Sequence, residues 1–288
     1  MISNESFSKV KYYLLFLILV ISFYRSPFIF LNGRFAAEEA TQHLLSALNN
    51  SFIGNFLFYD DLAGYYNILP NILLELSTLL PLEHSPYITV YGSFFFIFLI
   101  PYFCLNRESI LLNNNIKKIL SSFILFLAPP FVPEIWLNSI NLQVYMCLIA
   151  ILIFFMSNLT FVQMKINNIL IFLGSLSGIY TCALFPVYFV KYIYNKNNYN
   201  LINCLILFFS SIIQISLIIY SKINEKLVSS VLVNDFTLDT VVYFFYNIIL
   251  KPIFGRQVIH YFMNQLNLIE GTIIYLVLFL IIIFAIVL

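Results

Sequence analysis

Acidic side chains are the residues of this chain best suited to chemistry, and they gather in one stretch near its start. Six of the thirteen acidic residues fall within residues 26–85, and they are Glu38, Glu39, Asp60, Asp61, Glu75 and Glu83. Neighbouring carboxylates can share acid–base work, bind a metal ion or contact a sugar. The adjacent pairs at positions 38–39 and 60–61 are therefore the first candidates for a functional site.

The first acidic pair opens a segment with the pattern of an amphipathic helix. Apolar residues recur at three- and four-residue steps from Ala36 to Asn50, which predicts a helix with one apolar face. Glu38 and Glu39 fall in its first turn, where the helix dipole favours negative charge. Glu39 and His43 are four residues apart and share a face, so His43 is a candidate for contact with a substrate. The alternative is a solvated polar face with ordinary dipole matching.

The second pair, Asp60 and Asp61, stands beside Gly64 and two tyrosines. That setting suits a metal ion or a sugar, and a divalent metal is the one cofactor that the sequence leaves open. Asp is also common in turns, so the pair could simply end one helix and start the next. A second amphipathic helix is expected at Asn71–Leu82, where it would carry Glu75.

Three further candidate residues for a site lie outside residues 26–85. Glu134 belongs to a proline-rich segment between two apolar runs, and it could line the same cavity as the first acids or only a rigid turn. Lys251 and Arg256 flank a short Pro- and Gly-containing segment. Two cations so placed can hold a lipid phosphate, or they can simply extend toward lipid headgroups.

The composition identifies the surroundings of these residues. Of the 288 residues, 61% are hydrophobic and only 9% are charged, and the mean hydropathy is +0.94. A soluble domain carries about 25% charged residues, so a polytopic, all-α transmembrane bundle of about seven to eight spans is expected, one of them broken. The net charge of +1, without a basic stripe, argues against nucleic acid as a partner. The spans are expected near Tyr12–Leu31, Pro86–Leu105, Ile116–Val132, Leu142–Ser157, Ile169–Tyr192, Leu201–Tyr220 and Gly271–Leu288.

The positions of the lysines and arginines predict the orientation. Lys9, Lys11, Arg107, Lys117, Lys118 and Lys165 place the N-terminus and the adjacent turns in the cytoplasm. Residues 26–85 then form an extracytoplasmic loop with amphipathic helices at the membrane surface, and residues 221–270 form a second one. Lys191 and Lys196 fit only if the fifth span consists of two half-helices that turn near Gly178–Leu184.

Residues 1–288 are expected to form a single transmembrane domain. The last eight residues are apolar to the end, from which we expect a chain that is incomplete at its C-terminus. We expect a multi-pass protein of the bacterial inner (cytoplasmic) membrane, with membrane lipid as a partner.

Taken together, these features resemble the GT-C superfamily of membrane glycosyltransferases. Its members have a first span followed by a long extracytoplasmic loop, which opens with an acidic pair, often Asp-Glu-Ala, on a juxtamembrane helix. Residues 38–45, Glu-Glu-Ala-Thr-Gln-His-Leu-Leu, occupy that place, and the broken stretch from Gly174 to Pro186 also resembles a family feature. The chain departs from the pattern at Glu38, where the family often has Asp, and at Gln42, where an aromatic residue or His often stands.

The resemblance implies transfer of a sugar from a polyprenyl-phosphate carrier to an extracytoplasmic acceptor in cell-envelope polysaccharide assembly. Glu38 would be the base that deprotonates the acceptor hydroxyl, and Glu39 would position the acceptor or share the role. Two adjacent carboxylates can raise the pKa of one of them, which favours a base. Asp60 or Asp61 would support the site or bind a metal, and Lys251 and Arg256 would stabilise the leaving phosphate.

Three other functions stay open. A transporter or flippase usually carries ionisable residues inside its bundle, and the spans here are nearly free of them. A polymerase of the O-antigen or capsule type also uses lipid-linked sugars outside the membrane, but its large loop usually comes late in the chain. A non-catalytic membrane subunit or an inactive fragment is the third.

Overall fold

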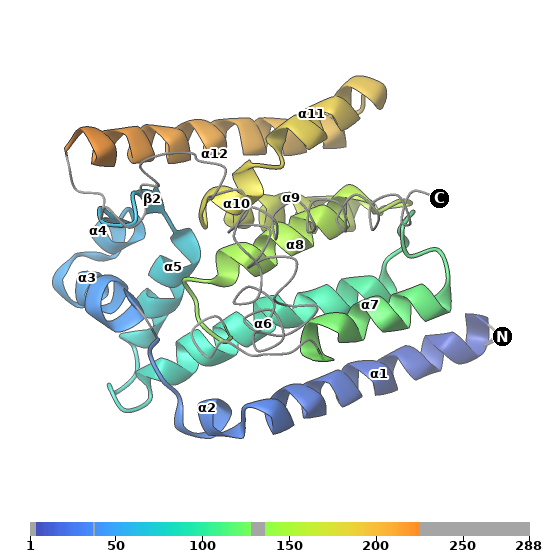
Figure 1. Cartoon of the computed structure of the whole chain (residues 1–288), viewed down its shortest axis with the longest axis horizontal. Helices are drawn as coiled ribbons and strands as arrows, with labels where there is room; N and C mark the ends of the chain where they lie inside the picture. The colour runs from blue at the N-terminus through green and yellow to red at the C-terminus, as the bar shows by residue number, and fades with distance from the viewer. Residues whose placement is uncertain (1–3, 37, 128–135, 225–288) are drawn as a thin grey trace, which may run out of the picture. The chain divides into compact units, whose positions relative to one another are not determined.

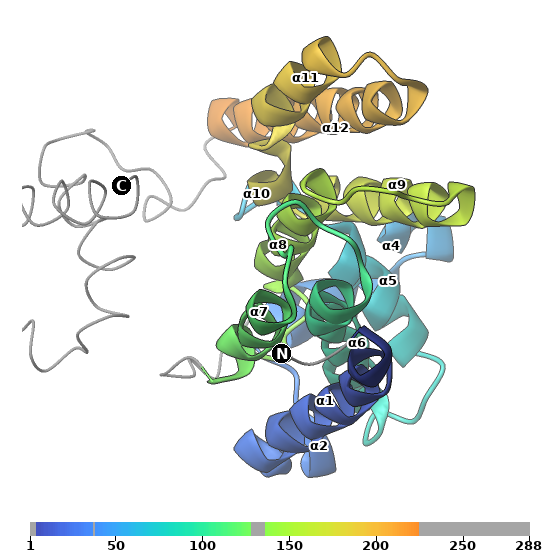
Figure 2. The ribbon, with the colours of Figure 1, turned by 90° about the vertical axis from the view of Figure 1, so that its right-hand side faces the viewer.

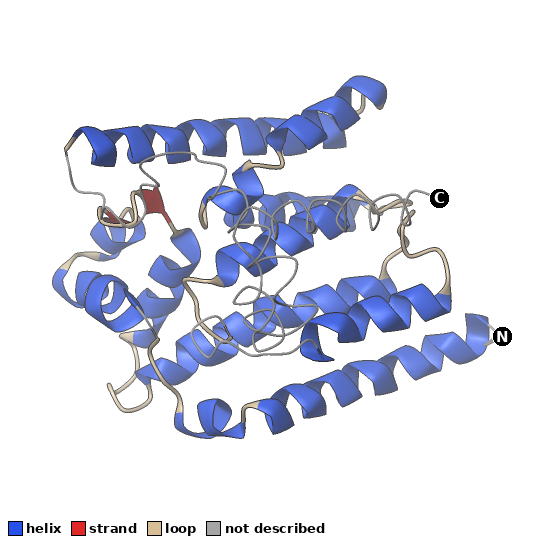
Figure 3. Ribbon diagram, viewed as in Figure 1, coloured by secondary structure: helices blue, strands red, loops and turns tan. Residues whose placement is uncertain are grey.

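The computed structural model describes residues 4–36, 38–127 and 136–224. This part of the chain is mostly helical, as Figure 3 shows, which confirms the all-α class. Its single β element is a hairpin of two short strands. The seventh expected span and residues 225–270 of the second expected loop lie outside the described residues.

The first part of the described chain runs from one long helix through a series of short elements. These are α1 (Asn4–Arg25), α2 (Pro27–Asn32), a π-helical segment η1 (Glu39–Leu44), α3 (Leu45–Asn49), α4 (Phe52–Phe56), β1 (Tyr59–Asp60), β2 (Tyr65–Tyr66) and α5 (Ile68–Ser77). Longer helices follow, namely α6 (Ser85–Asn106), α7 (Asn115–Leu127), α8 (Leu142–Phe154), α9 (Phe161–Ser175), α10 (Ile179–Cys182), α11 (Phe185–Tyr194) and α12 (Asn198–Ile223).

The long helices lie side by side, as Figures 1 and 2 show. α6 packs against α7 and α8, α8 packs against α9, and α12 packs against both α9 and α11. Ile97, Met146 and Ile149 are fully buried where these helices meet. Short turns connect most of the helices, so successive ones run in opposite directions along the bundle (Figure 1).

Two described helices, α6 and α12, are long and apolar enough to cross a membrane. They coincide with the expected spans Pro86–Leu105 and Leu201–Tyr220. The expected span Tyr12–Leu31 is instead two helices, α1 and α2, which are separated at Ser26. The expected spans that begin at Ile116 and Leu142 correspond to α7 and α8, each described over 13 residues.

The expected break in the fifth apolar stretch is present. α9 ends at Ser175, and Gly178 adopts φ +115°, a conformation that L side chains rarely adopt. A β-carbon at Gly178 would also collide with Oε1 of Gln143 on α8. After the short helix α10, α11 begins at Phe185 with Pro186 in its first turn, where proline is tolerated. The chain thereby reverses direction between α9 and α11.

The first long loop folds as a set of short elements at one end of the bundle, where α6 begins and α12 ends (Figure 1). The helix expected at Ala36–Asn50 is η1 followed directly by α3. The helix expected at Asn71–Leu82 is α5, which begins three residues earlier and ends at Ser77. Two features explain the shift: Pro70 suits a first helical turn, and Pro81 disfavours helical backbone at the residue before it.

Candidate functional site

Glu39 is fully buried, and its carboxylate accepts three hydrogen bonds. One comes from the backbone N–H of Ala36 at 2.7 Å, and two come from Ser139, from its N–H at 2.7 Å and from its hydroxyl at 2.6 Å. Burial raises the pKa of Glu39, and these hydrogen bonds and the nearby charge of Arg34 partly oppose that rise. Glu39 therefore connects η1 to the segment that precedes α8.

Glu38, the other member of the adjacent pair, is exposed at the N-cap position of η1. Successive helical residues point in different directions, so one carboxylate of the pair enters the protein and the other stays at its surface. Burial, rather than the neighbouring carboxylate, is the largest cause of the raised pKa of Glu39. The pair thus divides into an enclosed carboxylate and an accessible one.

His43 is 3% exposed and lies against the second helix of the loop. Its Nδ1 is 2.8 Å from Oδ1 of Asn71 on α5, and its ring meets Phe58 edge to face at 5.3 Å. Burial lowers the pKa of His43, while the bond to Asn71 and the negative charges of Asp60 and Glu38 oppose that change. The charges of Glu38 and Asp60 therefore both act on the His43 ring.

Asp60 is buried at the turn of the hairpin formed by β1 and β2. Its Oδ1 accepts a hydrogen bond from the N–H of Leu62 at 2.9 Å, and its carbonyl oxygen accepts one from the N–H of Gly64 at 2.8 Å. Gly64 supplies the positive φ of +73° that this turn needs. Asp60 therefore has the turn-forming role considered from the sequence, although the turn joins two strands rather than two helices.

Tyr65 lies opposite Asp60 in the hairpin register. Its hydroxyl oxygen accepts a hydrogen bond from Nε2 of Gln143 at 3.1 Å. Burial raises the pKa of Tyr65, and the charges of Asp60 and Glu38 raise it further. The charges of Glu38 and Asp60 therefore act on both His43 and Tyr65, and we name these four residues the loop cluster.

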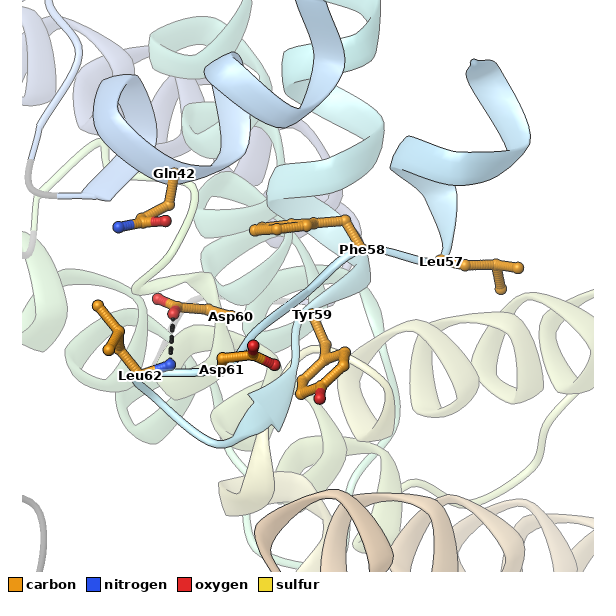
Figure 4. Close-up of a pocket in the computed structure, with 7 residues that line it drawn as sticks. All are labelled: Gln42, Leu57, Phe58, Tyr59, Asp60, Asp61 and Leu62. Carbon is orange, nitrogen blue, oxygen red and sulfur yellow. Dashed lines mark hydrogen bonds between the residues drawn. The ribbon is translucent and has the colours of Figure 1, made fainter. Parts of the chain in front are cut away.

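A cavity of about 400 Å³ lies beside the loop cluster (Figure 4). Figure 4 shows the Gln42 amide facing the Asp60 carboxylate across this space. Asp61 is hydrogen-bonded to the hydroxyl of Tyr59, which raises the pKa of Tyr59 to about 12. Carboxylates, an amide and aromatic rings thus surround one space. Its lining residues are Gln42, Leu57, Phe58, Tyr59, Asp60, Asp61 and Leu62.

The remaining acids of the loop have other positions. Glu75 accepts a hydrogen bond from Nδ2 of Asn55 at 2.7 Å, and this amide also donates to the carbonyl oxygen of Asn71 at 3.2 Å. Glu75 therefore helps to fasten α5, which also carries Asn71, to Asn55 of α4. Glu83 is exposed in the turn before α6.

Sequence reasoning missed three residues that hold this site, namely Tyr65, Asn71 and Ser139. The Gly after Asp60-Asp61 was a signal for the hairpin that places Tyr65. No local signal connects Ser139 to Glu39, because the two residues are 100 positions apart. Glu134, Lys251 and Arg256, which the sequence also suggested, lie outside the described residues.

Within residues 4–36, 38–127 and 136–224, no group of three or more His, Cys, Asp or Glu side chains could hold a metal ion. The described residues of the site supply carboxylates, an imidazole and hydroxyl groups. Comparisons of this chain with protein-family models, curated proteins and solved structures give no match.

Proposed function

We propose that the chain is a multi-pass membrane protein whose long helices cross the bilayer. The surface of α12 supports this, because only 28% of its most apolar stretch is buried. Phe209, Ile215 and Ile219 on α12 each expose more than half of their surface. The core helix of a soluble protein would enclose such side chains, whereas lipid solvates them without cost.

The distribution of charge supports an orientation. The start of α1, the turn between α6 and α7, the start of α9 and the end of α11 lie toward the right of Figure 1. By sequence, eight cations lie in or beside these segments: Lys9, Lys11, Arg107, Lys117, Lys118, Lys165, Lys191 and Lys196. Three described cations, Arg25, Arg34 and Lys222, belong to segments at the other end. By the preference of lysine and arginine for cytoplasmic turns, the end with the eight cations faces the cytoplasm. The loop cluster lies at the opposite end, on the extracytoplasmic side.

We further propose that the loop cluster catalyses glycosyl transfer from a polyprenyl-phosphate-linked sugar to an extracytoplasmic acceptor. One observation carries this proposal: Asp60 lines a cavity at the end of an apolar bundle, and its charge acts on His43 together with that of the exposed Glu38. A lipid-linked donor suits that position, since its tail can stay in the bilayer while its sugar reaches the cavity.

The chemistry needs a group that takes a proton and groups that hold sugar hydroxyls. The acceptor oxygen attacks the anomeric carbon, and the bond between that carbon and the phosphate oxygen breaks. Glu38 is the accessible carboxylate of the pair, so it can bind the acceptor hydroxyl or take its proton. Asp60, Asp61 and Gln42 can hold hydroxyl groups in the cavity, while Glu39 serves the structure. Lys251 and Arg256 keep their proposed role at the leaving phosphate.

The experiment compares the wild-type chain with two matched variants in isolated membranes. Radiolabelled polyprenyl-phosphate hexoses and pentoses are supplied, and label in acceptor material is measured. We expect Glu38→Gln to lower transfer about 100-fold or more, as the loss of a catalytic acid–base group usually does. Glu83→Gln removes an exposed acid of the same loop away from the cluster and should transfer at the wild-type rate. Equal transfer by both variants would contradict the proposal.

A further inference from the structure

The amide of Asn71 has one orientation in this structure, and its neighbours explain why. Its Nδ2 donates to the carbonyl oxygen of Phe58 at 2.7 Å and to that of Phe56 at 3.4 Å. Two carbonyl oxygens can only accept, so the amide nitrogen must face them. The amide oxygen of Asn71 is thereby turned toward His43.

This orientation fixes the tautomer of the His43 ring. Oδ1 of Asn71 is an acceptor, so Nδ1 of His43, at 2.8 Å, must carry the proton and donate it. In the neutral ring, Nε2 then has a free lone pair. The edge-to-face contact with Phe58, with ring planes at 85°, holds the plane of the imidazole. Asn71 therefore orients His43 in the way that a third residue orients the general base of a catalytic triad.

The other ring nitrogen is not engaged by the described part of the protein, although the His43 side chain as a whole is only 3% exposed. Among the described residues Nε2 of His43 has no hydrogen-bond partner, and it is not one of the fully enclosed unpaired polar atoms. Asn71 from α5 and Phe58, just before β1, contact the ring, and the charges of Asp60 and Glu38 act on it. Burial keeps the ring neutral, and the two carboxylates stabilise a positive charge that forms on it.

We propose that Nε2 of His43 is the proton acceptor of the transfer reaction, with Glu38 binding the acceptor hydroxyl. This assignment rests on the proposed function and refines it. As the acceptor oxygen bonds to the anomeric carbon, its proton passes to Nε2 and the polyprenyl phosphate leaves with the electron pair of the broken bond. The charges of Glu38 and Asp60 stabilise the imidazolium that results, and it returns its proton to water.

The first arm of the test needs no activity. The purified full chain is treated with diethyl pyrocarbonate, which acylates neutral imidazoles, and the peptides are analysed by mass spectrometry. His84, exposed at the start of α6, is the internal reference for an accessible histidine. We expect acylation of His43 at near-neutral pH. A chain in which His84 reacts completely and His43 does not react would overturn the proposal, because Nε2 would then be closed.

The second arm uses the transfer assay across pH 5 to 8. We expect His43→Gln to lower kcat about 100-fold or more with little change in KM, and His84→Gln to behave as wild type. The wild-type rate should rise with pH through the lowered pKa of His43, and in Glu38→Gln that rise should move to lower pH, because a charge that favours the imidazolium is gone.

The outcomes separate the two proposals. If the rise with pH persists in His43→Gln and disappears in Glu38→Gln, then Glu38 is the base and the proposal for His43 is wrong. If the wild-type chain transfers no sugar from any donor, the proposed function fails and the role of His43 fails with it. Because the acylation of His43 is measured on the folded wild-type chain, a misfolded variant cannot decide the result.

Discussion

Glu39 and Ser139 meet through two hydrogen bonds on one carboxylate oxygen, although they stand 100 residues apart in the chain. The backbone N–H and the hydroxyl of Ser139 both donate to Oε1, while the other oxygen accepts from Ala36. A buried carboxylate is costly unless donors surround it, and these three donors meet that requirement. The start of η1, and with it the exposed Glu38, is thus held against the segment before α8.

Glu39→Gln should therefore lower the stability of the folded chain. The amide NH₂ group would face an N–H donor at either end, so at least one buried donor would lose its partner, at a cost of about 1–3 kcal/mol. Glu38→Gln, a change of the same chemistry at the exposed neighbour, should stay within about 0.5 kcal/mol of wild type. The detergent-solubilised proteins are heated, and the fraction that still elutes as a monodisperse peak in size-exclusion chromatography gives the melting temperature of each. Equal melting temperatures would show that the Ser139 contact carries little stability.

The pH dependence of that difference has a definite sign. The pKa of Glu39 is raised on folding, so its contribution to stability is fully present below the unfolded pKa of about 4.3 and is lost as pH rises through the folded value. The gap in melting temperature between wild type and Glu39→Gln should therefore narrow from pH 4 toward pH 8. Taking the difference cancels the titration of the other acids. A gap that widens with pH would mean that the three hydrogen bonds lower the pKa of Glu39 by more than burial raises it.

The sequence predicted the elements whose signals are local. α6 and α12 begin and end within a few residues of the expected spans, because each is a long apolar run with polar residues at its ends. Gly178 and Pro186 likewise marked the break after α9. The helical setting of Glu38 and Glu39 followed from the periodicity of the residues after them.

The arrangement of the site did not follow from local patterns. The partner of His43 is Asn71, 28 residues away, and the partner of the Tyr66 backbone is Gln214, 148 residues away. Such pairs depend on how helices distant in sequence pack, which periodicity does not encode. The division of the 38–39 pair into an enclosed and an exposed carboxylate also depends on Ser139, so the sequence could name both acids but could not separate their roles.

Gln214→Leu should loosen the hairpin that carries Asp60 and Tyr65. The Gln214 amide bonds both backbone groups of Tyr66, accepting from its N–H and donating to its carbonyl oxygen, each at 2.9 Å. Leucine fills the space but leaves two buried backbone groups unpaired, at a cost of about 2–4 kcal/mol. Thermal melting should show this loss, and Ile215→Leu, at the exposed next position, should melt as wild type. An unchanged melting temperature in Gln214→Leu would show that the hairpin does not depend on α12.

Gly178→Ala, in the break between α9 and α10, should destabilise the chain and disturb the contact between Gln143 and Tyr65. Alanine at φ +115° is strained, and its β-carbon would displace Gln143, the donor to the Tyr65 hydroxyl. We expect a loss of about 2 kcal/mol or more in stability. The matched change Gly54→Ala lies on the exposed helix α4 without a positive φ, and its β-carbon would lie 3.2 Å from that of Asn50, so only a small shift is needed. We expect it to stay within about 0.5 kcal/mol of wild type. If the two variants melted alike, the conformation of Gly178 would not be required.

The proposed topology predicts which loops an impermeant reagent can reach. Glu83→Cys places a thiol in the exposed turn before α6, at the end of the bundle that carries the loop cluster. Asn113→Cys places one in the exposed turn before α7, at the end that carries the lysines. In intact cells or oriented vesicles, a charged maleimide should label Glu83→Cys directly and Asn113→Cys only after the membrane is permeabilised. The unsubstituted chain gives the background from Cys104, Cys147, Cys182 and Cys204. Labelling of both positions from the same side would contradict a membrane-crossing α6, whereas the reverse pattern would place the loop cluster in the cytoplasm.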